Sequence, residues 1–147
     1  MRQLDEELVS FSPEVRRRLE ALRAEPKFGP HSYPPAGYTG PDTPEDLEPL
    51  VAIVNLAIEA VLSISGETIA ASSVRPILHR AIEEGDLFAT EDRERVWGYV
   101  LEIWYILDFH SPLFAELLSY RGVQLPDGYS EPLPPGWSSP GQPREID

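Results

Sequence analysis

The chain has 147 residues, of which 41% are hydrophobic and 25% charged, and this composition is typical of one globular domain that folds without disulfides or metal. It has no cysteine, which excludes thiolate catalysis and cysteine-ligated metal sites. The net charge of −13, from 25 acidic and 12 basic residues, opposes binding to nucleic-acid phosphates and to anionic membranes.

The N-terminus and the apolar runs predict a cytoplasmic protein. Residues 1–7 read MRQLDEE, with acids where a secretion signal has a basic start and an apolar stretch. The two longest apolar runs, Leu50–Ile64 and Val96–Leu107, are shorter than the ~20 residues that span a bilayer, and each contains an acid. We therefore expect core helices and no membrane span.

The first predicted helix begins at Ser12-Pro13-Glu14 and runs to about Ala24. A hydroxyl residue before a proline and an acid marks a helix start, because the hydroxyl caps a free backbone N–H and the proline presets the first helical φ. Apolar residues lie on one face and the arginines lie largely elsewhere, which is typical of an amphipathic surface helix.

A proline-rich segment, Pro26–Pro41, follows the first helix. It carries Phe28, Tyr33 and Tyr38 among its prolines and glycines, and we expect an extended or polyproline-like conformation. A second segment of this kind, Gln124–Asp147, contains Trp137 and ends the chain. The aromatic residues predict arms that attach to the rest of the fold or to a neighbouring chain.

The second predicted helix, Pro44–Ile64, is apolar on nearly all sides. In its later turns only Asn55, Glu59 and Ser63, spaced by four, interrupt the apolar residues. A helix that is apolar all round is surrounded by other elements, so we expect this one at the centre of a bundle.

Three more helices are predicted beyond it. One runs from Ser72 or Ser73 to Glu84, with Gly85 as its stop, and the last runs from Pro112 to about Arg121. Between them, Thr90–Asp108 is a second strongly apolar helix. Its thin polar edge consists of Arg95, Gly98 and Glu102.

These elements predict an all-α fold: a compact bundle of about five helices around two strongly apolar central helices, with two proline-rich extended arms. Residues 1–122 form the helical domain, including the connection 26–41, and residues 123–147 form the C-terminal arm.

Few residues suit catalysis or metal binding. His79 and Glu83 share a helix face, which suits an orienting pair for a catalytic base but is more often a surface ion pair. His110 lies at a helix C-terminus, where a cation complements the dipole. A metal site would need His79 and Glu83 to meet His110 and Asp108, and no metal-binding motif is present. We predict no catalytic residue, no metal and no cofactor.

The polar line Asn55, Glu59 and Ser63 has two interpretations. An acid on an apolar helix is paired, hydrated or protonated. The favoured interpretation is a solvent-facing edge, since charges are seldom fully buried. The alternative is a pocket formed by this line together with Glu102, and a small enzyme with a cleft between the two central helices would use Glu59, His79 or Glu102.

Residues 67–88, ETIAASSVRPILHRAIEEGDLF, resemble the helix-turn-helix of winged-helix regulators. The similar positions are Ile69, Val74, Leu78, Gly85 and Leu87. The resemblance implies a short helix, a turn and a recognition helix, with the basic side chains toward the DNA groove. These side chains are Arg75, His79 and Arg80. A degenerate helix-turn-helix regulator is therefore an alternative function.

The leading functional interpretation is a non-catalytic module that binds a basic protein. No Lys or Arg occurs from Phe28 to Val74, and four acids cluster there: Asp42, Glu45, Asp46 and Glu48. We expect these acids to steer a basic partner and Tyr33, Tyr38 or Trp137 to anchor it. By charge and helical class alone the chain is similar to bacterial immunity proteins, which neutralise a basic toxin; an accessory subunit is an equivalent reading. A homodimer stays open.

Overall fold

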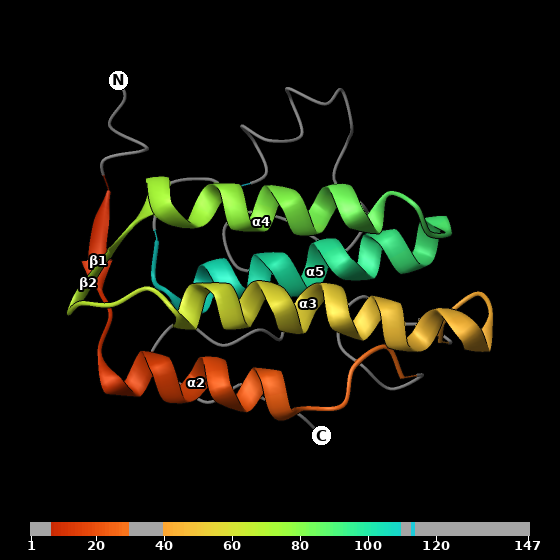
Figure 1. Ribbon diagram of the computed structural model, residues 1–147, viewed down its shortest axis with the longest axis horizontal. Coiled ribbons are helices and arrows are strands. Elements are labelled where there is room, and N and C mark those ends of the chain that lie inside the picture. The colour runs from red at the N-terminus through yellow and green to blue at the C-terminus, as the bar shows by residue number, and fades with distance from the viewer. Residues whose placement is uncertain (1–6, 30–39, 110–112, 114–147) are drawn as a thin grey trace.

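The computed structural model describes residues 7–29, 40–109 and 113, and these residues are mostly helical (Figure 1). The elements, in chain order, are strand β1 (Leu8–Ser10), helix α2 (Pro13–Ala24), the short 3-10 helix η1 (Pro44–Asp46), helix α3 (Leu47–Leu62), strand β2 (Thr68–Ala70), helix α4 (Ala71–Gly85) and helix α5 (Thr90–Ile106). Helix α3 lies between α2 and α4 and also contacts α5 (Figure 1). The predominantly helical fold predicted from the sequence is confirmed.

Helix α2 begins as its sequence predicts. Ser12 is the N-cap, and its hydroxyl oxygen accepts a hydrogen bond from the backbone N–H of Val15 at 3.2 Å. Pro13 follows in the first turn, and Leu19 and Leu22 are buried against the bundle. The predicted bounds of this amphipathic helix are therefore confirmed.

Helix α3 supplies the centre of the core, but only part of its surface is covered. Leu50, Val54 and Ile58 are fully buried, as expected for a central helix. Leu56, in contrast, is 60% exposed, and Ala60 is exposed too. The prediction that this helix is surrounded on all sides is wrong, because the helices that pack on it leave the Leu56 side open.

Helix α4 differs from its prediction at both ends. It begins at Ala71, before the expected serines, so Pro76 lies beyond the first turn, on the exposed side of the helix. Gly85 ends the helix without a left-handed φ. A Cβ added to Gly85 would lie 3.3 Å from Val96, so the glycine permits close approach of α4 and α5.

A two-stranded antiparallel sheet closes the end of the molecule where α3 ends and α4 begins (Figure 1). Val9 pairs with Ile69, and the N–H of Phe11 donates to the carbonyl of Glu67 at 2.8 Å. This sheet is not predicted from the sequence, because strands of three residues are too short for a recognisable alternation. Strand β2 also corrects the helix-turn-helix resemblance in 67–88. The strand lies where the first helix is required, and a single continuous helix, α4, follows it.

Helix α5 is buried on every side from Arg95 to Trp104. Trp97, Trp104 and Tyr99 lie in the core, as its apolar sequence predicts. The expected polar edge does not face solvent, however, because Arg95 and Glu102 are also buried. The guanidinium carbon of Arg95 lies 3.9 Å from the centroid of the Tyr99 ring, and this stacking gives a buried cation a favourable neighbour.

The start of the first proline-rich arm is anchored in the core. Phe28 has φ +62° and is buried; its N–H donates to the Tyr99 hydroxyl at 3.1 Å, and the two ring centroids are 5.1 Å apart. Phe28 is therefore not in the extended conformation expected for this segment. The predicted last helix, 112–121, apart from Leu113, the C-terminal arm and most of the first arm lie outside the described residues.

Among the described residues, no helix combines the length and apolar character needed to cross a membrane.

Candidate functional site

Two acidic segments that are distant in the sequence lie at one end of the molecule. Segment 42–48 leads into α3, and segment 83–94 spans the end of α4, the connecting loop and the start of α5. Figure 1 shows the start of α3, the end of α4 and the start of α5 at the same end of the bundle. We call this surface the acidic pole. Its acids are Asp42, Glu45, Asp46, Glu48, Glu83, Glu84, Asp86, Glu91, Asp92 and Glu94.

A hydrogen bond joins the two segments of the acidic pole. The backbone N–H of Asp42 donates to the Asp92 carboxylate oxygen Oδ2 at 2.9 Å. Asp92 is only 1% exposed, so its carboxylate serves to position the 42–48 segment and not to meet a partner. Asp42, Glu45 and Glu48 remain exposed beside it.

The second segment was not predicted as part of the site. Residues 83–94 hold six acids against one base, Arg93, so the acid content itself is visible in the sequence. What the sequence does not show is that this segment meets 42–48, because the two are joined only through the antiparallel arrangement of α3, α4 and α5 (Figure 1).

The acids of the pole differ in their effect on the helices that carry them. Glu48 in α3 and Glu91 in α5 lie in first turns, where the helix dipole stabilises a negative charge. Glu83 and Glu84 lie in the last turn of α4, followed by Asp86, and no basic residue accompanies them there. A negative charge at a helix C-terminus is unfavourable, and for Glu84 the ion pair with Arg80 at 3.2 Å offsets this cost.

Two exposed apolar side chains lie among the acids of the acidic pole. Leu87, in the loop between α4 and α5, is 86% exposed, and Leu47, the first residue of α3, is 41% exposed. Exposed leucines surrounded by charged residues are typical of protein-binding surfaces, in which apolar contacts hold a partner that charge has attracted.

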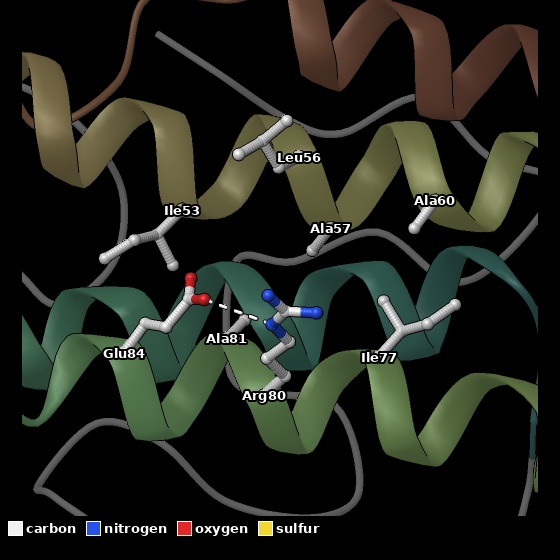
Figure 2. Close-up of a pocket in the computed structure, with 8 residues that line it drawn as sticks. All are labelled: Ile53, Leu56, Ala57, Ala60, Ile77, Arg80, Ala81 and Glu84. Atoms are coloured by element: carbon white, nitrogen blue, oxygen red, sulfur yellow. Dashed lines mark hydrogen bonds and ion pairs between the residues drawn. The ribbon is translucent and has the colours of Figure 1, made fainter.

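A groove of about 310 Å³ lies between α3 and α4 and reaches the acidic pole at Glu84. Figure 2 shows Ile77 and Arg80 pointing from α4 toward α3, opposite Ala57 and Ala60. Its other lining residues are Ile53, Leu56, Ala81 and Glu84. Arg80 Nε donates to the Glu84 carboxylate at 3.2 Å on the α4 side. The groove is thus mainly apolar, with one ion pair on its rim.

The residues of the alternative pocket lie apart from this groove. Glu59 is exposed and pairs with Arg23 of α2, with 3.3 Å between Oε2 and Nη1. The Ser63 hydroxyl donates to the backbone carbonyl of Glu59 at 2.9 Å, and Asn55 is half-buried on the same helix. Glu102 is buried in α5 and does not line the groove.

Glu102 instead acts on a partly buried arginine. Burial lowers the pKa of Arg18, and the negative charges of Glu14 and Glu102 oppose this shift. Glu102 therefore acts as a counter-charge for Arg18 of α2. No local sequence pattern predicts this role.

In the part of the chain that the structure describes, the candidate catalytic and metal-binding residues are not gathered into a metal site. His79 is half-buried on α4, Glu83 is exposed, and Asp108 is exposed after α5. Within 7–29, 40–109 and 113, no group of three or more His, Asp or Glu side chains is arranged to hold a metal ion. His110, Tyr33, Tyr38 and Trp137 lie outside the described residues.

Comparison with known proteins identifies a family without a known activity. The model of a family described as a domain of unknown function, DUF4844, matches residues 10–113. This match runs from the end of β1 to Leu113, so it includes helices α2, α3, α4 and α5 and both halves of the acidic pole. No curated protein and no solved structure matches the chain significantly.

Proposed function

We propose that this chain, which belongs to the DUF4844 family, is a non-catalytic module whose acidic pole binds a basic protein partner. The partner would be an enzyme or toxin that the chain neutralises, or a protein that it assists. The single observation that carries the proposal is the meeting of two acidic segments, 42–48 and 83–94, at one end of the bundle.

Charge density supports this choice of surface. The two segments contribute ten acids and one arginine, and together they account for much of the net charge of −13. A concentrated negative field attracts a basic surface over about a Debye length, ~8–10 Å at physiological salt, and raises the rate of productive encounters. The exposed Leu87 and Leu47 would then supply apolar contacts that slow dissociation.

The unfavourable acids at the end of α4 give further support. Glu83, Glu84 and Asp86 lie where the dipole of α4 favours cations. Residues whose placement costs stability are characteristic of functional surfaces. A basic partner would stabilise the negative charges at this helix end.

The proposal is tested with three charge-neutralised variants, each of which removes four negative charges. The first changes Asp42, Glu45, Asp46 and Glu48 to their amides. The second changes Glu83, Asp86, Glu91 and Glu94. The matched control changes four exposed acids elsewhere: Glu14, Glu20, Glu59 and Glu67. The partner is captured from the native source with the wild-type chain and identified by mass spectrometry, and its association rate is measured for every variant at several salt concentrations.

We expect either pole variant to slow association about tenfold at low salt and to weaken its salt dependence, because steering raises association rates by 10-fold or more. The control should slow it by about threefold at most. If all three variants slow association equally, only the net charge matters; if neither pole variant slows it, the pole is not the binding face. Either result would refute the proposal.

A further inference from the structure

The open side of α3 is an apolar helix surface beside the groove. Pro49, Ala52, Leu56 and Ala60 follow one another along this helix, three to four residues apart, and all four are exposed. Residues at this spacing lie along one helical face. Leu56, at 60% exposure, is the largest of them. This face continues into the groove through Ile53 and Ala57 (Figure 2).

The shape of the groove suits a helix. Its α3 wall runs from Ile53 to Ala60, about two turns or ~10 Å along the axis. Three of its lining residues are alanines, Ala57, Ala60 and Ala81, and small side chains let a third helix approach α3 and α4 closely. A helix laid in such a groove buries side chains spaced by three and four residues.

The charges around the groove indicate which charged residues a bound helix would carry. The wall from α3 carries no basic residue, since no Lys or Arg occurs between Phe28 and Val74. The wall from α4 carries Arg80, whose charge is paired with Glu84. Toward the acidic pole the groove ends at Glu84, and Glu48 lies on α3 in the same direction. One end of the groove is therefore strongly negative.

We propose that the groove between α3 and α4 receives an amphipathic helix of the partner, with its apolar face on Leu56 and the alanines and with basic residues over the acidic pole. This inference rests on the proposed function, because it assigns the basic partner a docking element. A second copy of the chain is the less favourable occupant, since each copy carries a net charge of −13.

The probe is a fluorescein-labelled synthetic peptide of about four helical turns. Its leucines are spaced alternately three and four residues apart, its other positions are alanine and glutamine, and lysines are placed at one end. A scrambled peptide of the same composition lacks the leucine face, and a third peptide has glutamine in place of lysine. Binding to the full chain is measured by fluorescence anisotropy.

The test variant is Leu56→Gln and its matched control is Leu8→Gln. Leu8 lies in β1 and is 63% exposed, almost the same as Leu56, but does not line the groove. Both leucines face solvent, so both variants should fold, and thermal unfolding is recorded for each. We expect Leu56→Gln to weaken peptide binding about tenfold, because it removes a large apolar contact, and Leu8→Gln to change it by less than about twofold.

We also expect the scrambled and the lysine-free peptides to bind about tenfold more weakly than the probe. No binding of the probe, equal binding of the scrambled peptide, or equal effects of the two leucine variants would overturn the inference. Sedimentation of the chain alone tests whether a second copy occupies the groove. If the chain is a dimer and Leu56→Gln dissociates it, a second copy fills the groove and the inference is overturned.

Failure of this inference differs from failure of the proposed function. If the native partner is sensitive to the pole variants but not to Leu56→Gln, the acidic pole binds the partner and the groove does not. If the probe binds in a Leu56-dependent way while the native partner ignores the pole variants, the groove binds helices and the proposed function is wrong.

Discussion

Three consecutive arginines in α2 have the same chemistry and three different roles. Arg17 is exposed and pairs with Glu14. Arg18 is half-buried, with a pKa lowered by burial. Arg16 donates to three backbone carbonyls beyond α2: Leu62 at 3.3 Å, Ile64 at 3.2 Å and Gly66 at 3.0 Å. The last carbonyls of a helix have no partner within the helix, so Arg16 caps the end of α3 from a neighbouring element.

This difference predicts unequal losses of stability. Arg16→Gln should lower the free energy of unfolding by about 2 kcal/mol, since it removes charged hydrogen bonds to three carbonyls, of which those of Leu62 and Ile64 are partly buried. Arg17→Gln, a surface ion pair, should change it by about 0.5 kcal/mol or less. Urea unfolding followed by circular dichroism measures both. Equal losses would show that the contacts of Arg16 contribute no more than those of an exposed arginine.

At the scale of the element, α3 and α4 show which features of a helix its own sequence pattern predicts and which it does not. The capped start of α2 and the ends of α3 and α4 lie within a few residues of their predicted positions, because capping depends on adjacent residues. The open side of α3 and the glycine contact between Gly85 and Val96 depend on which helices pack together. Periodicity within one helix holds no information about that choice.

The dipole of α4 gives the second stability prediction. Glu83→Gln should raise the free energy of unfolding by about 0.3–1 kcal/mol at low ionic strength, because it removes a negative charge from a helix C-terminus. Glu14→Gln, in the first turn of α2, should lower it by a similar amount. Both effects should shrink as salt is added. Thermal unfolding at two salt concentrations checks the pair, and a loss of stability in Glu83→Gln would contradict the dipole argument.

At the scale of the whole molecule, the charge of the chain acts against its own fold. With 25 acids and 12 bases, the compact state brings negative charges together, and the acidic pole concentrates them at one end. The buried charges have favourable neighbours, such as the ring of Tyr99 beside Arg95, so the repulsion arises mainly at the surface.

Screening this repulsion should stabilise the chain. We expect the melting temperature to rise by a few degrees between about 10 mM and 200 mM sodium chloride, since the Debye length falls from ~30 Å to ~7 Å over that range. The variant with amides at Glu83, Asp86, Glu91 and Glu94 should show a smaller rise. A melting temperature that falls with salt in the wild-type chain would mean that attractive ion pairs outweigh the repulsion.

The sequence by itself determined the helical class, the start of α2, the central position of α3 and the acidity of segment 42–48. These follow from rules that act within one or two turns: capping, helical periodicity and local charge. Only the tertiary structure decided that strands β1 and β2 pair, that Glu102 is buried and does not line the groove between α3 and α4, and that segment 83–94 joins segment 42–48 at one pole. Each of these joins residues far apart in the sequence, and such contacts are set by how the helices pack.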